Sequence, residues 1–234
     1  MSADAAVRRW VTHRNDLPVP TVVHLHGGRT PSDSDGYPLD FLNPSDMSYM
    51  NGRMQPDMRG RTTMREPGGD VTQGQRTYTY PLDQRAAGLW YHDHRMDFTG
   101  ASVWRGLVGF HLHRDDEEDA LGLPSGSREL PLMILDRSFN SDGSFLYPSV
   151  DPTLVNTPGV TDRFVPGVLG DTMLVNGTPW PQAQVKGAHY RLRLLNARNA
   201  RRLSLRLDPP TSPVTPRAQR SPWSTTSATS KWRT

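Results

Sequence analysis

The sequence predicts an all-β protein built as an antiparallel β-sandwich. Short runs of alternating or β-branched apolar residues recur along the 234-residue chain, and turn-forming residues, including 20 glycines and 21 prolines, separate them. Almost no segment has the 3.6-residue apolar period of an amphipathic helix. Short strands with frequent turn signals and no helical repeat are typical of an antiparallel sandwich.

The predicted strands follow one another along the chain with loops between them. Residues 1–20 hold one short apolar patch and two prolines, and we expect them to lead into the fold without a strand. A buried strand is predicted over residues 21–25, ending at the turn Gly27-Gly28, and a long polar loop over residues 29–75. The further predicted strands are 76–80, 89–94, 103–113, 130–136, 171–175 and 189–195.

Two His-x-His pairs stand at the ends of two predicted strands. His24 and His26 end one of them, and His92 and His94 end another. Alternate side chains of a strand leave the same face of a sheet, roughly 6.5–7 Å apart at their roots. Such a pair suits two neighbouring metal ions, or one ion held from two strands. Imidazole binds copper, zinc, iron and nickel, so the ligand type alone does not select the metal.

The sequence around these pairs resembles the first third of the multicopper oxidases. The most similar branch is that of the bacterial spore-coat laccases and bilirubin oxidases, and the resemblance covers about residues 20–207. In the first domain it rests on residues 21–28, 34–38, 89–94 and 106–110. In the second domain it rests on residues 130–132, 136–137, 142–144, 147–149, 170–172, 174–177 and 195–197.

This resemblance implies a cupredoxin-like Greek-key fold and a partial set of copper ligands. By it, His24 binds the type 2 copper, and His26, His92 and His94 bind the paired type 3 coppers of a cluster that reduces dioxygen to water. The implied partners are dioxygen and a small phenolic or pigment-like electron donor. Asp35, in the turn Ser34-Asp35-Gly36, would deliver protons as a general acid. The alternative is that Asp35 only forms the turn.

The same resemblance divides the chain into two domains. Residues 1–115 are expected to form a first cupredoxin-like domain lacking its first strands, 116–127 a linker, and 128–207 the beginning of a second cupredoxin-like domain. Residues 208–234 contain eleven Ser or Thr and five Pro, a composition that predicts disorder. We hypothesise that the family sequence stops near Pro210 and that a frameshifted or spurious reading follows.

Much of the family's copper machinery is expected to be missing from this chain. The other two His-x-His pairs and all ligands of the mononuclear copper belong to a C-terminal domain of the family. The chain has no cysteine, and a thiolate is required at that mononuclear site. We therefore expect the copper-binding portion of a laccase-like oxidase that is inactive alone, with a C-terminal portion acting in trans. The alternative is a non-catalytic copper-binding module or a gene remnant.

Other metal-binding folds fit the sequence less well. A cupin has a glutamate shortly after its His-x-His, where this chain has Thr30 and Pro31. A barrel-type metal hydrolase often uses a bridging lysine, but the chain has two lysines, Lys186 and Lys231, and is too short for eight βα units.

Several other residues are predicted to be structural. His111 and His113 form a third His-x-His, interpreted as a strand end with partly solvated imidazoles, and His13 and His189 as surface residues. Asp93 is predicted to face away from its neighbouring ligands, and the tryptophans at 10, 90, 104 and 180 to be core aromatics. Methionines 47, 50, 54, 58 and 64 form either a Cu(I)-docking segment or ordinary gap fillers.

The charge distribution argues against a nucleic-acid or membrane partner. The net charge is +3, and residues 208–234 alone carry four basic residues against one acidic residue, so residues 1–207 sum to zero. The first 15 residues show no apolar core of a secretory signal, and no run approaches the roughly 18 apolar residues of a membrane helix. The sequence leaves the localisation unknown.

Overall fold

The computed structural model describes residues 9–45, 69–147 and 167–205. The methionine-rich segment and the predicted disordered tail lie outside the described residues. None of the described helices is long and apolar enough to cross a bilayer. The strands are β1 Arg9–Arg14, β2 Val23–His26, β3 Leu42–Asn43, β4 Thr72–Gln73, β5 Gln75–Tyr80, β6 Ala87–Asp93, β7 Val108–His113, β8 Glu129–Arg137, β9 Thr172–Val175, β10 Thr178–Pro179 and β11 Arg191–Asn196. The helices are α1 Thr99–Trp104, α2 Asp116–Ala120 and the 3-10 turn Gly126–Arg128.

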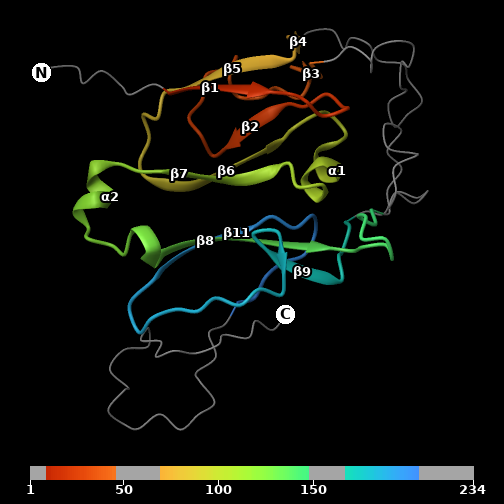
Figure 1. The fold of residues 1–234 in the computed structure, drawn as a ribbon. Coiled ribbons are helices and arrows are strands. Elements are labelled where there is room, and N and C mark those ends of the chain that lie inside the picture. The colour runs from red at the N-terminus through yellow and green to blue at the C-terminus, as the bar shows by residue number, and fades with distance from the viewer. Residues whose placement is uncertain (1–8, 46–68, 148–166, 206–234) are drawn as a thin grey trace, which may run out of the picture.

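The first half of the chain forms two packed layers of sheet. One layer is the antiparallel sheet β2-β6-β7, and the other is the antiparallel pair β1-β5, which lies beside β2 in Figure 1. Leu25, Tyr78, Tyr80 and Leu89 are buried together between the layers. The alternation along β2 and β6 therefore sends one set of side chains into this core and the other set to the opposite face.

The second half forms a sheet of its own against the first. Its strand order is β10-β9-β8-β11, drawn below β7 in Figure 1. Val103 and Val108 from the first half share a buried cluster with Leu135, Leu174 and Ala197 from the second. This cluster joins the two sheets into one packed unit.

The all-β prediction is confirmed, but several of its elements are wrong in detail. The strand predicted over 103–113 begins at Val108, and its first residues belong to helix α1 and the following turn. Trp104 in α1 is fully buried, so a short apolar run here is a buried helical turn, which periodicity alone does not separate from a strand. The predicted linker includes helix α2, whose first turn is capped by the Asp115 carboxylate, which accepts a hydrogen bond from the Glu118 amide at 2.7 Å.

Two further differences concern the sheets. Residues expected to lead into the fold instead form β1, which pairs with β5 along its whole length from Arg9↔Tyr80 to Arg14↔Gln75. The strand was missed because its side chains are mostly polar and only Val11 packs into the core. Strand β11 pairs with β8 in parallel, where an antiparallel sandwich was expected.

The tryptophan predictions are right only in part. Trp104 is buried in the core as predicted. Trp10 and Trp180 are 69% and 59% exposed, so their assignment to the core is wrong. Trp10 faces outward on β1, and Trp180 follows β10 in a left-handed backbone conformation with φ 45°.

A cluster of ion pairs ties the linker helix to the second sheet. Glu129 at the start of β8 accepts hydrogen bonds from Arg114 and, at 2.8 Å, from Arg193 on β11. Glu118 in α2 accepts from Arg193 at 2.8 Å and from Arg191. Both carboxylates are buried, and a buried carboxylate is stable only when it is paired in this way.

Glu129→Gln is expected to destabilise the fold in a pH-dependent manner. The hydrogen bond from Arg114, aided by Arg193 and opposed by burial, lowers the pKa of Glu129 below its ordinary value. A group whose folded pKa is depressed contributes stability above its unfolded pKa, about 4.3, and loses it as pH falls through the folded value. Urea unfolding should therefore show a loss at pH 7 that disappears towards pH 3. Glu117→Gln, whose partner Arg85 is exposed, is the control, and a pH-independent loss in Glu129→Gln would contradict the assignment.

Candidate metal centre

The pairing of β2 with β6 places histidines opposite one another. In this antiparallel register His24 faces His92 and His26 faces Trp90. Directly opposed side chains have Cβ atoms about 4.5–5.5 Å apart, within reach of a shared ligand. One ring nitrogen from each of His24, His26 and His92 lies within 4.8 Å of the others. Three of the four predicted ligands thus converge at one face of the sheet.

The fourth histidine adjoins this group. His94 follows the end of β6, and its backbone N–H donates to the Val22 carbonyl at 2.8 Å. Its ring centroid lies 5.0 Å from that of His24 and 5.5 Å from that of His92. Its ring is partly buried and lies beside the Gly36 backbone, with which it can form a hydrogen bond.

Main-chain carbonyls orient two of the rings. The Nδ1–H of His24 donates to the Asp35 carbonyl at 2.5 Å, and that of His92 donates to the Asp93 carbonyl at 2.8 Å. Because a carbonyl oxygen only accepts, Nδ1 carries the hydrogen in both rings. Each Nε2 lone pair is therefore available to a metal ion, as in most protein metal sites.

The surroundings favour the neutral form of two of the histidines, His92 and His94. Burial lowers the pKa of His92, and the neighbouring histidines lower it further, against the opposing Asp93 carbonyl. Burial also lowers the pKa of His94, followed by the effect of His24. Neutral imidazole is the form that binds metal ions. Burial therefore favours the ligating state of His92 and His94.

The turn that carries Asp35 is folded tightly against β2. Gly36 has φ +77°, and a Cβ there would lie 2.3 Å from the Val23 carbonyl oxygen, so only glycine fits. This close approach brings the Asp35 carbonyl to His24. The Asp35 carboxylate lies 3.6 Å from His24 Nδ1, and half of the side chain, 50%, is exposed.

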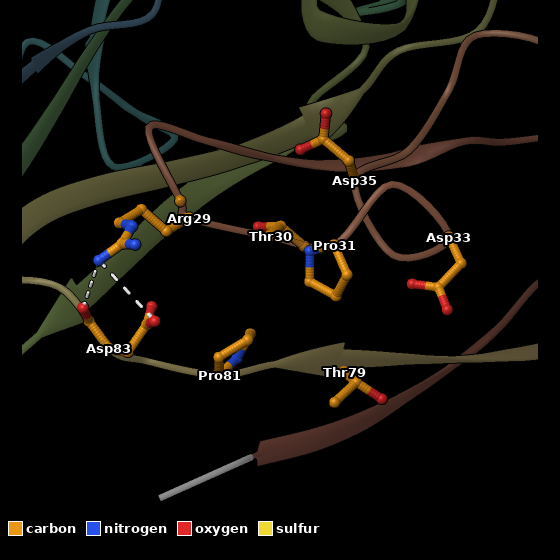
Figure 2. Close-up of a pocket in the computed structure, with 9 residues that line it drawn as sticks. Arg29, Thr30, Pro31, Asp33, Asp35, Thr79, Pro81 and Asp83 are labelled. Carbon is orange, nitrogen blue, oxygen red and sulfur yellow. Dashed lines mark hydrogen bonds and ion pairs between the residues drawn. The ribbon is translucent and has the colours of Figure 1, made fainter. Parts of the chain in front are cut away.

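An open cleft of about 800 Å³ lies next to this turn (Figure 2). Asp33, Asp35 and Asp83 are among the residues that line it. Arg29 donates to the Asp83 carbonyl at 2.9 Å and lies 3.8 Å from the Asp83 carboxylate. Asp35 both lines the cleft and contacts His24. Asp35 is therefore the residue that links the lining of the cleft to the histidine cluster.

The remaining predictions for polar residues have mixed outcomes. Asp93 is structural, as predicted, because its buried carboxylate accepts a hydrogen bond from the Val22 amide at 2.7 Å. His189 is exposed, as predicted, whereas His13 is partly buried against Tyr78, with ring centroids 5.4 Å apart.

The third His-x-His is less solvated than predicted. His113 is buried and donates Nε2–H to the Gln84 carbonyl at 2.7 Å, while His111 is partly buried near Tyr80. Neither belongs to the group of converging ring nitrogens among the described residues. The third pair is therefore structural, as predicted, but its imidazoles are packed within the protein rather than solvated.

The sequence analysis missed one residue of the site. Trp90 was assigned to the core, but it also lies on the histidine face and stacks on His26 and His92, with ring centroids 4.8 Å and 4.3 Å away. Its position two residues before His92 on a strand was the available signal, because such residues share a face.

Comparisons with known proteins identify the class to which this fold and site belong. The chain is 42% identical to a laccase of Bacillus subtilis over 209 residues, which is 88% of this chain and 36% of that protein. It is 36% identical to the multicopper oxidase LPR1 of Arabidopsis thaliana over 217 residues, 83% of this chain and 33% of that protein. The structure of the multicopper oxidase McoA from Aquifex aeolicus matches with a TM-score of 0.59 and 28% identity, over 84% of this chain and 35% of McoA. No protein-family model matches the chain.

The chain belongs to the multicopper oxidases, and its solved relatives have the cupredoxin fold. Within that family it is similar to the laccases of Bacillus, including one from Bacillus stratosphericus at 42% identity. It spans about a third of the length of these relatives, 35% and 36% for the two Bacillus laccases. The cofactor of the family is copper, and the converging imidazoles of His24, His26 and His92 fit copper as a ligand set.

Gly36→Ala is expected to destabilise the protein more than Gly143→Ala. Both glycines have positive φ, +77° and +84°, but a Cβ at Gly143 meets nothing within 4 Å. Gly143→Ala should therefore cost only the left-handed conformation, about 1–2 kcal/mol. Gly36→Ala adds the clash with Val23 and should cost more in the free energy of unfolding, measured in urea. Equal costs at the two sites would show that the turn is not packed on β2.

Proposed function

We propose that this chain provides the N-terminal half of the copper-cluster ligands of a laccase-like oxidase. In this proposal His24 binds the type 2 copper, and His26, His92 and His94 bind the type 3 pair. The observation that carries it is the convergence of three imidazole nitrogens within 4.8 Å on a face that two strands share. Copper bound there would supply one-electron redox chemistry, coupling oxidation of a phenolic or pigment-like donor to reduction of dioxygen to water.

The protein's part in this function is to hold the rings in place before the metal binds. The carbonyls of Asp35 and Asp93 fix the rings of His24 and His92, so little rotational freedom remains to be lost when the metal binds. Ligand sites built on paired strands are held more rigidly than sites on loops.

Asp35 is proposed as the proton donor. Its carboxyl group is half-exposed to solvent and lies 3.6 Å from His24. A carboxyl group in this position can take a proton from solvent and release it beside the cluster, which is general acid work. The contact that orients His24 is made by the carbonyl of the same residue, so the two roles use different atoms.

The division into domains is proposed along the lines of the sequence analysis. Residues up to 115 contain strands β1–β7, and residues 128–207 contain β8–β11, with helix α2 in the proposed linker 116–127. The separate sheets support this division, and the shared apolar cluster would be the interface between the domains.

The chain is proposed to require further sequence for turnover, in cis or in trans. The two Bacillus laccases are about three times as long as the matched region, and no cysteine is available for a copper thiolate. His26 is exposed, and on β11 Leu192 and Leu194 are 37% and 49% exposed. Such open faces are suited to cover by additional protein. The second candidate function is a non-catalytic copper-binding module. The convergence of the histidines supports this function as well.

Cu(II) titration of the chain, with a competing chelator, tests the metal site. We expect His26→Ala and His92→Ala to weaken binding by about tenfold or more, because loss of a residue that only hydrogen-bonds to a metal ligand already lowers metal affinity that much. His111→Ala is the matched control, because it removes a histidine from the same sheet outside the cluster. Asp35→Asn should leave the affinity within about threefold, because the orienting carbonyl is retained. If His111→Ala weakened binding as much as His26→Ala, the proposed site would be wrong.

Oxygen uptake separates the two candidate functions. The copper-loaded chain, supplied with a phenolic donor, is expected to consume no oxygen above a copper-free control. If the chain is part of an oxidase, adding the remaining part of a Bacillus laccase as a separate chain should produce oxygen uptake. Sustained uptake by the chain alone would disprove the need for a further portion, and failure of complementation would favour the non-catalytic module.

A further inference from the structure

His26 differs from its neighbours in how its ring is held. His24 and His92 each donate Nδ1–H to a main-chain carbonyl. In the described part of the chain, neither ring nitrogen of His26 makes a hydrogen bond, although the residue is exposed at the end of β2. An exposed imidazole without a hydrogen bond would ordinarily sample several rotamers. Its ring nevertheless takes part in the group of converging nitrogens.

Trp90 provides a flat surface on which this ring lies. It is the direct cross-strand partner of His26, and the two rings stack with centroids 4.8 Å apart and planes at 26°. The indole stacks in the same manner on His92, at 4.3 Å and 27°. Near-parallel contacts at these separations are favourable arrangements of aromatic rings.

The Trp90 indole also packs against the hydrophobic core. Trp90 is partly buried and packs against the cluster of Val103, Val108, Leu135, Leu174 and Ala197 that joins the two sheets. Strand geometry and this packing restrict its rotamer, so it can act as a fixed support. The contact with the core and the contact with the imidazoles are made by the same side chain.

We propose that Trp90 is a positioning residue for His26 and His92. It would take for His26 the role that a carbonyl takes for the other two rings, while leaving both His26 nitrogens open to a metal ion. This inference rests on the proposed function, because it matters only if these histidines are metal ligands. Loss of an outer partner of a metal-binding histidine typically costs 10–100-fold in affinity.

Cu(II) affinity of the whole chain, measured by chelator competition, tests this role. Trp90→Leu is expected to weaken binding by about tenfold or more, and Trp90→Phe, which restores a flat ring, by less than about threefold. Trp10→Leu is the matched control, because Trp10 is 69% exposed on β1. Thermal unfolding of each variant reports on folding, and if Trp90→Leu does not fold, Trp90→Met, whose unbranched side chain adapts to irregular gaps and has no ring, replaces it.

A double-mutant cycle distinguishes positioning from general packing. If Trp90 acts through His26, Trp90→Leu should weaken Cu(II) binding less in a His26→Ala background than in the unaltered chain. An equal loss in both backgrounds, or no loss on Trp90→Leu while His26→Ala does weaken binding, would overturn this inference alone. Absence of Cu(II) binding by the unaltered chain would overturn the proposed function and this inference with it.

Discussion

The antiparallel pairing of β2 with β6 is the interaction on which the site depends. Because side chains alternate along a strand, a slip of one residue would turn every histidine of one strand to the opposite face. The observed register pairs His24 with His92. It is fixed at its end by two contacts to Val22, whose amide donates to the Asp93 carboxylate and whose carbonyl accepts from the His94 amide. The contacts of Val22 with Asp93 and His94 thus keep the histidines of the two strands in register.

The hydrophobic core and the metal site are set by the same alternation. Leu25 on β2 and Leu89 on β6 point into the core with Tyr78 and Tyr80. The residues next to them in sequence, His24 and His26 on β2 and Trp90 on β6, point the other way. Any register that buried the leucines correctly would also gather the imidazoles, so the burial of apolar surface stabilises the ligand geometry. This explains how two short strands can build the site without a hydrogen-bond partner for every ring.

Strand alternation alone was enough to predict that the two histidines of each pair share a face. His-x-His at a strand end predicts a shared face, and the two pairs do meet. The register between strands far apart in sequence is a tertiary property, so neither the stack of Trp90 on His26 nor the carbonyl contact of Asp35 was predictable. Strand β1 escaped prediction because its stability comes from pairing with β5 rather than from its own apolar residues. The parallel pairing of β11 likewise depends on where its partner lies.

The second sheet contributes to the site although it provides none of the converging imidazoles. Trp90 contacts the rings of His26 and His92 on one side and, on the other, the cluster that includes Leu135 and Leu174 from β8 and β9. Order in the second sheet therefore restrains the indole, and the indole restrains the rings. A ligand that binds only the folded state stabilises it by mass action, and coupling between sites is reciprocal. If metal binds on β2 and β6 as proposed, it stabilises the packing of the second sheet to the same degree that this packing strengthens metal binding.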